Sequence, residues 1–377
     1  MARKLKSDWL LFTATLLLVS ISVVMVYSAS AVVALEKNHD PYLYLVKQTT
    51  WALLGFGLVA IVMRIDYRSY REPSVIWTGV GLVGLALVAV LFSRPINGAS
   101  RWLGVGPLGM QPSELAKIVV IIFTAAILER RMDRVTDSPT ALVPIGVVVG
   151  ALVALILAEP DLGTAVSVLV IAAVMVFTAG IGYRYVVTLA LAALPALYLV
   201  VVSSPYRLRR FQHFLDPWAA PLHGGYQMIQ SMIAVGTGGV FGRGLMAGVQ
   251  KLFFLPEPHN DFIYSVIAEE LGLIGATVVL ACFCVITWRG LRTAVRAPDR
   301  FGAFLAIGLT TMVAFQAFFN ISVVLGLVPP KGIPLPFVSY GGSSLLINLV
   351  GMGILLNVSQ HASSTHVVTT AMTAPDA

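Results

Sequence analysis

The chain has 377 residues, of which 58% are hydrophobic and only 11% carry a charge. Soluble globular proteins carry a charge on about a quarter of their residues, so this composition excludes an ordinary water-soluble enzyme. Many apolar stretches reach the length of about 20 residues that a helix needs to cross a bilayer. The sequence therefore predicts an all-α integral membrane protein.

The basic residues are placed as in membrane proteins. Lys and Arg outnumber Asp and Glu by 25 to 18, which gives a formal net charge of +7. They stand at the ends of apolar runs, and no basic stripe alternates with aromatic side chains. Such placement is typical of orientation signals in membranes and argues against nucleic acid as a partner.

The apolar runs predict ten transmembrane helices in a single membrane domain, 1–377. The spans are expected at 9–33, 46–63, 74–92, 113–128, 141–157, 164–180, 185–202, 262–287, 301–325 and 343–358. Between the seventh and eighth spans, 203–261 forms a long extracytoplasmic loop, in which the apolar stretch 228–235 is expected to lie along the membrane surface. The tail 359–377 is rich in Ser and Thr and is predicted to be disordered.

The orientation follows from the charges of the loops. The loops on the side of the N-terminus hold Arg3, Lys4, Lys6, Arg64, Arg68, Arg71, Arg130, Arg131, Arg134, Arg184, Arg289, Arg292, Arg296 and Arg300. The short loops on the other side hold only Lys37, Arg94, Arg101 and Lys331. Because cytoplasmic loops are enriched in Lys and Arg, both termini are predicted to be cytoplasmic.

Charged residues within or beside spans are the first candidates for function, because each is costly to place in a membrane. Glu114 and Lys117, at the start of the fourth predicted span, are three residues apart on one helix face and can form an ion pair. Pro112 and Ser113 before them make a good helix start, so we favour a structural pair. The alternative is that Lys117 offers its charge to a phosphate.

A second group of polar residues lies in 255–261, directly before the eighth predicted span. Asp261 has two interpretations: a helix N-cap, or a general base whose pKa is raised by partial burial at the membrane boundary. His259 is a competing base. A third interpretation makes Asp261 and Glu257 ligands of a divalent cation, Mg²⁺ or Mn²⁺; no cofactor is otherwise indicated.

Two adjacent acids, Glu269 and Glu270, follow Asp261 by eight and nine residues. On a continuous helix they would lie roughly 12 Å deeper. We expect at least one to face other helices, either protonated or paired with a cation such as Lys117, in a structural role.

The segment 329–344, between the last two predicted spans, contains Lys331, Ser339 and Ser343. Its four prolines cannot continue a helix, whereas Gly341 and Gly342 followed by serines offer free N–H groups at a helix start. Such a segment can cradle an anion. The alternative is a re-entrant loop whose polar groups are satisfied within the bundle.

Several of these blocks together resemble the SEDS family, the shape, elongation, division and sporulation proteins of bacteria. The matching blocks are 97–102, 111–114, 159–164, 255–257, 261–263 and 339–343, and the resemblance covers nearly the whole chain. Residues 209–210, 214–218 and 250–253 are more similar to the division branch, FtsW, than to the elongation branch, RodA. Asn260 and Lys331 depart from the family, since Thr is common at both positions.

The resemblance implies a ten-span peptidoglycan glycosyltransferase in the bacterial cytoplasmic membrane, with its active site facing outward. It would polymerise lipid II onto undecaprenyl-linked glycan beside a class B penicillin-binding protein and other divisome or elongasome membrane proteins. Asp261 matches the essential acid of the family, and we expect it to act as a general base. Other residues expected to bind the substrate or its pyrophosphate are Arg101, Lys117, Arg207, Arg210, His259, Lys331, Ser339 and Ser343.

Two other functions are compatible with many spans and intramembrane charges: a lipid II flippase and a non-catalytic scaffold for the penicillin-binding protein. Transport through the membrane would place polar residues along its whole depth. Here the ionisable groups gather toward the outer half, which favours the enzyme.

Overall fold

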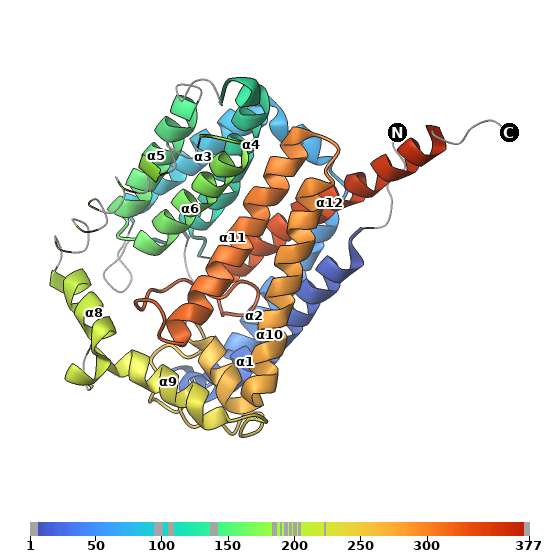
Figure 1. Cartoon of the computed structure of the whole chain (residues 1–377). Helices are drawn as coiled ribbons and strands as arrows, with labels where there is room; N and C mark the ends of the chain where they lie inside the picture. Colours follow the sequence, from blue (N-terminus) through green and yellow to red (C-terminus); the bar gives the residue numbers. More distant parts are fainter. Residues whose placement is uncertain are drawn as a thin grey trace.

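The structure, a computed structural model, describes residues 7–93, 101–104, 109–135, 142–182, 205–221 and 224–372, with a few isolated residues between 187 and 202. Within these ranges the regular structure is helical, apart from a single antiparallel bridge between Leu103 and Met110. Figure 1 shows the helices packed side by side as one bundle. This confirms the predicted all-α class.

The described helices overlap most of the predicted spans. They are α1 (Trp9–Asn38), α2 (Leu43–Val62), α3 (Pro73–Leu91), α4 (Pro112–Val135), α5 (Val143–Ala158), α6 (Leu162–Thr178), α8 (Pro205–Leu215), α9 (Tyr226–Gly238), α10 (Ile263–Val295), α11 (Arg300–Val324) and α12 (Gly342–Met372), with the short helical turns η1 (Tyr67–Arg71) and η4 (Pro217–Ala219). Helices α4, α10 and α12 extend beyond the predicted ends of their spans. The exception to the overlap is 185–202, most of whose residues lie outside the described part of the chain.

The described chain contains 6 helices that are long and apolar enough to cross a membrane: α1, α2, α3, α10, α11 and α12 as far as Ala362. Two shorter helices, α5 and α6, are also strongly apolar. Capping residues set the starts of α1 and α11. Asp8 caps α1 by accepting the N–H of Leu11, and Asp299 caps α11 by accepting the N–H of Gly302. The chain is a multi-pass membrane protein.

Helix α11 is the centre of the bundle. It packs against α10 on one side and against α4 and α6 on the other, while α1 contacts α2 and α10, and α2 lies along α12. In Figure 1, α3, α4, α5 and α6 form one half, and α1, α2, α10 and α12 form the other.

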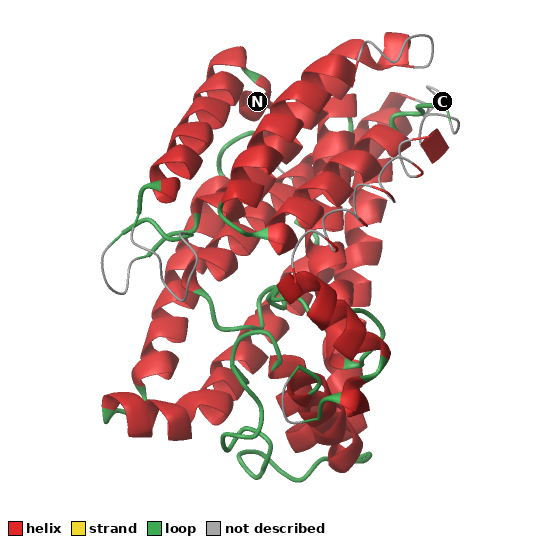
Figure 2. Ribbon diagram, turned by 90° about the vertical axis from the view of Figure 1, so that its left-hand side faces the viewer, coloured by secondary structure: helices red, strands yellow, loops and turns green. Residues whose placement is uncertain are grey.

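The two ends of the chain meet at the same end of the bundle. The backbone N–H of Asp8, before α1, donates to Ser359 Oγ on α12 at 3.3 Å. Helices α8 and α9 lie at the opposite end, and Figure 2 shows long loops gathered there.

Helix α12 corrects the prediction for the C-terminal tail. A disordered tail was expected from 359, but the helix continues to Met372. Ser359 and His361 are buried, and His361 Nδ1 lies 2.9 Å from the carbonyl oxygen of Asn357. The Ser- and Thr-rich composition suggested disorder, but the first residues of this segment are packed against α1 and the α2–α3 connection.

The eighth predicted span is interrupted near its start. Gly272 inside α10 has a φ of 67°, and a Cβ there would overlap the backbone of Val240 and Gly242. The loop after α9 therefore crosses α10 at Gly272, which only glycine permits. Glu269 and Glu270 lie in the helical segment before this break, so the helix between Asp261 and these two acids is continuous from Ile263, as expected.

Candidate functional site

Five parts of the chain surround a cleft of about 680 Å³. Its lining comes from α2, the loop before α4 with the start of that helix, the start of α6, the loop before α10, and the segment before α12 with the start of that helix. The lining residues are Lys47, Trp51, Arg101, Trp102, Gly104, Gly109, Gln111, Glu114, Asp161, Thr164, Glu257, Asn260, Asp261, Gly332, Pro334, Tyr340, Gly341, Gly342, Ser343 and Ser344. The cleft thus brings together most of the motifs that the sequence singles out.

Asp261 lies in the cleft in the loop before α10. Helix α10 begins at Ile263 with Phe262 as its N-cap and has no side-chain capping bond, so the N-cap interpretation of Asp261 is wrong. The carbonyl of Asp261 accepts a hydrogen bond of 2.8 Å from Asn320 Nδ2, which also donates to the carbonyl of Ile333 at 2.8 Å. Its carboxylate lies against Gly332, where a Cβ would come within 2.8 Å of Oδ2. Asn320 and Gly332 therefore position the acid.

The carboxyl of Asp261 is a stronger base than an ordinary aspartate. Burial, and then the nearby carboxylate of Glu257, raise its pKa from 3.8 to about 6. The positive charges of Arg210, Arg101 and Lys331 act in the opposite direction. At neutral pH the group is ionised yet has a high proton affinity, which is what a general base requires.

His259 is packed against two tyrosines, Tyr44 and Tyr340, whose rings also contact each other. Its ring centroid lies 4.8 Å from that of Tyr44 and 5.7 Å from that of Tyr340, and its Nε2 is 3.8 Å from Glu257 Oε2. Burial lowers the pKa of His259. The ring is therefore neutral near pH 7, and unlike Tyr340 it is not part of the cleft lining.

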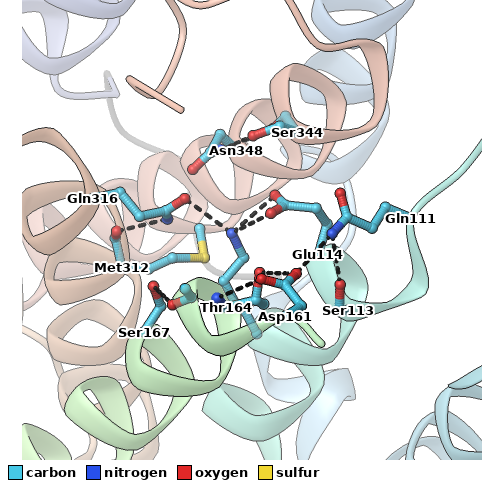
Figure 3. Close-up of polar contacts among 12 residues, drawn as sticks. Gln111, Ser113, Glu114, Asp161, Thr164, Ser167, Met312, Gln316, Ser344 and Asn348 are labelled. Carbon is cyan, nitrogen blue, oxygen red and sulfur yellow. Dashed lines mark hydrogen bonds and ion pairs between the residues drawn. The ribbon is translucent and has the colours of Figure 1, made fainter. Parts of the chain in front are cut away.

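The start of α6 is bonded to the start of α4. Asp161 caps α6 by accepting the N–H of Thr164 at 3.2 Å and its hydroxyl at 2.7 Å. Gln111 Nε2 donates to Asp161 Oδ2 at 3.0 Å and to Ser113 Oγ at 2.9 Å. Figure 3 shows these groups beside Glu114. Together they fix one wall of the cleft.

The structure contains the ion pair between Glu114 and Lys117. The ammonium of Lys117 lies 2.9 Å from both carboxylate oxygens and 2.9 Å from Gln316 Oε1 on α11, and all three side chains are buried (Figure 3). These contacts use the three ammonium hydrogens. Glu114, not Lys117, lines the cleft, so this geometry gives no support to a phosphate-binding role for Lys117.

Arg101 ties the loop before α4 to the α5–α6 connection. Its Nε donates to the carbonyl of Glu159 at 3.2 Å and its Nη2 to that of Pro160 at 2.6 Å. The Glu159 side chain is fully buried, and its carboxylate has no hydrogen-bond partner among the described residues. Burial, then Asp161, raise the pKa of Glu159 to about 8, so the group is neutral near pH 7. Glu159 is not among the predicted site residues, although it belongs to the block 159–164 that resembles the family.

The remaining predicted binding residues differ in what they contact. Ser339 Oγ donates to the carbonyl of Asn260 at 2.6 Å and accepts the N–H of Leu335, so its hydroxyl holds the segment together. Ser343 lines the cleft at the start of α12. Arg210 Nη1 on α8 lies 3.5 Å from the carbonyl of Pro330. The side chain of Arg207 lies outside the described residues.

Glu269 and Glu270 have the structural role that was expected, but with another cation. Glu270 accepts hydrogen bonds from Lys251 Nζ, from Ser28 Oγ at 2.7 Å and from the N–H of Met246 at 2.9 Å. Glu269 accepts the N–H of Val249 at 2.8 Å. The predicted partner Lys117 is wrong, because Lys117 is held by Glu114 and the loop before Asp261 brings Lys251 back onto α10 instead.

A family model described as a cell cycle protein, covering FtsW, RodA and SpoVE, matches residues 8–364. The chain belongs to this family. A probable peptidoglycan glycosyltransferase FtsW from Geobacter sulfurreducens is 45% identical over 356 residues, which are 93% of this chain and 95% of the relative. The stage V sporulation protein E of Bacillus subtilis is 42% identical over 362 residues, 96% of this chain and 99% of the relative.

Solved structures of the family have the same fold. A chain from a structure described as "Structural coordination of polymerization and crosslinking by a peptidoglycan synthase complex" superposes with a TM-score of 0.77 at 30% identity, covering 95% of this chain and 99% of that one. The rod shape determining protein RodA of Thermus thermophilus gives a TM-score of 0.70 at 29% identity, covering 94% and 97%. The family fold therefore extends over almost the entire chain.

Proposed function

We propose that this chain polymerises lipid II into glycan strands, with Asp261 as the general base. The chain is a peptidoglycan glycosyltransferase, the activity given in the names of relatives 45% identical over 93% of its length. The observation that carries the catalytic assignment is the position of Asp261: it lies in the cleft, against Gly332, with a pKa raised to about 6.

The reaction is a single displacement. Asp261 takes the proton from the 4-hydroxyl of the acceptor sugar as that oxygen attacks the anomeric carbon of the donor. The bond from this carbon to the pyrophosphate breaks, and undecaprenyl pyrophosphate leaves with the electron pair. Inversion at an α-linked donor gives a β-linked glycan, and the proton passes from Asp261 to solvent.

The leaving pyrophosphate needs positive charge near the base. Arg101, Arg210 and Lys331 are close enough to Asp261 to lower its pKa, so they are the cations that would also face a pyrophosphate in this cleft. Ser343, with the backbone N–H groups at the start of α12, adds hydrogen-bond donors. Arg207, on the same helix as Arg210, is expected to contribute as well.

A divalent cation remains a proposal for two acids of the cleft. Glu257 and Asp261 both line the cleft, and their carboxylates repel each other when both are ionised. Among the described residues, no group of three or more His, Cys, Asp or Glu forms a metal site. Mg²⁺ or Mn²⁺ would therefore need ligands from the substrate phosphates, which is how Mg²⁺ is commonly bound.

We place the cleft on the outer face of the bacterial cytoplasmic membrane. The contact between Asp8 and Ser359 joins the two ends of the chain at the face where the predicted cytoplasmic loops carry most Lys and Arg. A tenth span within 185–202 would complete this topology. A class B penicillin-binding protein is the proposed partner, with other division or elongation membrane proteins, since a similar chain occurs in a complex described as coupling polymerisation and crosslinking.

The test is synthesis of glycan strands from pure lipid II by the purified protein, with and without its class B penicillin-binding protein. We expect polymer from the wild type with the partner, and a loss on the order of 100-fold in Asp261→Asn, the usual scale for a lost general base. Asp40→Asn is the matched control, because Asp40 is an exposed acid at the start of α2, outside the cleft.

Three outcomes would overturn the proposal. Substantial polymer from folded Asp261→Asn would remove Asp261 as the base and point to Glu257 or His259. Robust lipid II flipping in liposomes, with no polymer under any partner or metal condition, would replace the polymerase with a transporter. Normal wall synthesis in cells that carry only Asp261→Asn would instead favour a scaffold.

A further inference from the structure

One part of the cleft has no role in the mechanism above: the face of α2 that bears Lys47 and Trp51. These residues are four apart in a helix, so their side chains lie on the same face, and both line the cleft that contains Asp261. Neither belongs to a motif that the sequence analysis singles out. Their position indicates contact with whatever occupies the cleft.

Trp51 is held in place by the segment before α12. A Cβ on Gly342 would overlap the Trp51 indole ring, so the ring lies directly on this glycine. One turn away, Gln48 Nε2 donates to Ser22 Oγ at 2.8 Å and to the carbonyl of Ser339 at 3.4 Å, which ties α2 to the same segment. The indole is therefore a preorganised flat surface at the edge of the cleft.

Lys47 differs from Arg101 and Lys117 in its contacts with the described residues. Arg101 is bonded to two backbone carbonyls and Lys117 to Glu114 and Gln316. For Lys47, in contrast, the described part of the chain supplies no ion pair and no side-chain hydrogen bond, although the residue is partly buried. A lysine that lines a cleft and has no protein partner for its charge among the described residues favours an anionic group of a ligand.

We propose that Lys47 and Trp51 form a saccharide subsite of this cleft. The apolar face of a pyranose ring lies on the Trp51 indole, and an anionic group attached to that sugar pairs with the Lys47 ammonium. A lipid-linked disaccharide peptide has two such groups next to its sugars, the pyrophosphate and the peptide carboxylates. The inference rests on the proposed function and adds a substrate contact to it.

The subsite predicts a defect in binding, not in chemistry. In polymerisation of lipid II by the full-length protein with its penicillin-binding partner, Lys47→Met and Trp51→Leu should each raise KM about tenfold and leave kcat within about twofold. Lys47→Arg and Trp51→Phe keep the charge and the aromatic plane and should recover most of the affinity. The control Lys37→Met removes a lysine from the exposed last turn of α1, outside the cleft, and should leave KM unchanged.

A glycine offers a second test that leaves both side chains intact. Gly342→Ala should displace the Trp51 indole and raise KM as Trp51→Leu does. Gly57→Ala is its control, because a Cβ on this α2 glycine meets nothing within 4 Å. If Gly342→Ala folds and keeps the wild-type KM, the indole does not carry the sugar. Unfolding temperatures of all variants identify any that fail to fold, in which case Lys47→Met and its Arg counterpart decide.

Two inhibitors distinguish the sources of the anionic group. Undecaprenyl pyrophosphate carries phosphates and no sugar, whereas a soluble disaccharide pentapeptide carries sugars and carboxylates and no phosphate. If undecaprenyl pyrophosphate inhibits Lys47→Met more weakly than the wild type, Lys47 binds the pyrophosphate. If the disaccharide pentapeptide does so, Lys47 binds a peptide carboxylate. Unchanged inhibition by both, with wild-type KM, overturns the subsite while polymerisation by the wild type still supports the proposed function. Absence of polymer from the wild type is instead a failure of the proposed function.

Discussion

If Asp261 is the general base, polymerisation should rise with pH as its carboxyl ionises. Burial and Glu257 raise its pKa from 3.8 to about 6. The ionised fraction then falls from roughly 0.9 at pH 7 to about 0.1 at pH 5, so kcat/KM should drop about tenfold over this interval. An aspartate with its ordinary pKa would stay about 0.9 ionised at pH 5, and activity would hardly change.

Neighbouring charges should move this profile in opposite directions. Glu257→Gln removes a negative charge that raises the pKa of Asp261, so the rise in activity should shift to lower pH. Arg210→Gln and Lys331→Met each remove a positive charge that lowers it, so the rise should shift to higher pH. Glu36→Gln, an exposed acid in the last turn of α1, should shift nothing.

The assay is kcat/KM for lipid II between pH 4.5 and about pH 8.5, because this ratio reports the ionisation of the free enzyme. Loss of substrate binding in the Arg210 and Lys331 variants lowers the whole curve without moving its midpoint. Asp261 would be refuted as the titrating base if all four variants kept the wild-type midpoint. The same would follow if the midpoint shifted in the same direction for Glu257→Gln and Arg210→Gln.

Two further predictions concern buried charges, and a third concerns a metal ion. Asp261→Asn should raise the unfolding temperature more at pH 8 than at pH 5, because a rise in pKa from 3.8 to about 6 destabilises the folded ionised protein by about 3 kcal/mol above pH 6 and not at all below pH 3.8; equal stability of the two proteins at both pH values would contradict the burial of its charge. Glu114→Gln and Lys117→Met should each destabilise the bundle by about 3–5 kcal/mol, and the double variant by less than their sum, because each single change leaves a buried charge unpaired; additive losses of denaturation free energy would exclude the pairing. EDTA should reduce polymerisation, with Mn²⁺ or Mg²⁺ restoring it and Glu257→Gln raising the metal concentration required; full activity after exhaustive chelation would exclude the cation.

The helices could be predicted because a span is a local property of the chain. The apolar run from Trp9 and the charges that bound it are sufficient to indicate α1. The break at Gly272 could not be predicted, because the apolar pattern continues across it. It exists only because the distant backbone at Val240 and Gly242 crosses the helix there. Contacts of this kind are set by packing between segments, not by composition.

The candidate site was predictable to a similar degree. Charges out of place in apolar surroundings indicated Glu114, Lys117 and Asp261, and the spacing of the first two predicted their pairing. Lys251 was missed because it stands in an irregular loop, and nothing local shows that the loop folds back onto Glu270. Trp51 was missed because an aromatic residue within an apolar span is ordinarily interpreted as one that packs against neighbouring helices or lipid.

Helix α11 shows how a membrane bundle can hold a polar cleft rigid. Gln316 and Asn320 are four residues apart and so share a face of this central helix. Gln316 accepts a hydrogen bond from Lys117, which holds Glu114, while Asn320 donates to the loop of Asp261 and to the segment before α12. The Gln316 amide is bonded through both its oxygen and its nitrogen, whereas Asn320 donates twice and its Oδ1 has no partner among the described residues. One face of α11 therefore fixes the positions of the Glu114–Lys117 pair, Asp261 and the segment before α12 relative to one another. The charges of the cleft are then in place before a substrate binds.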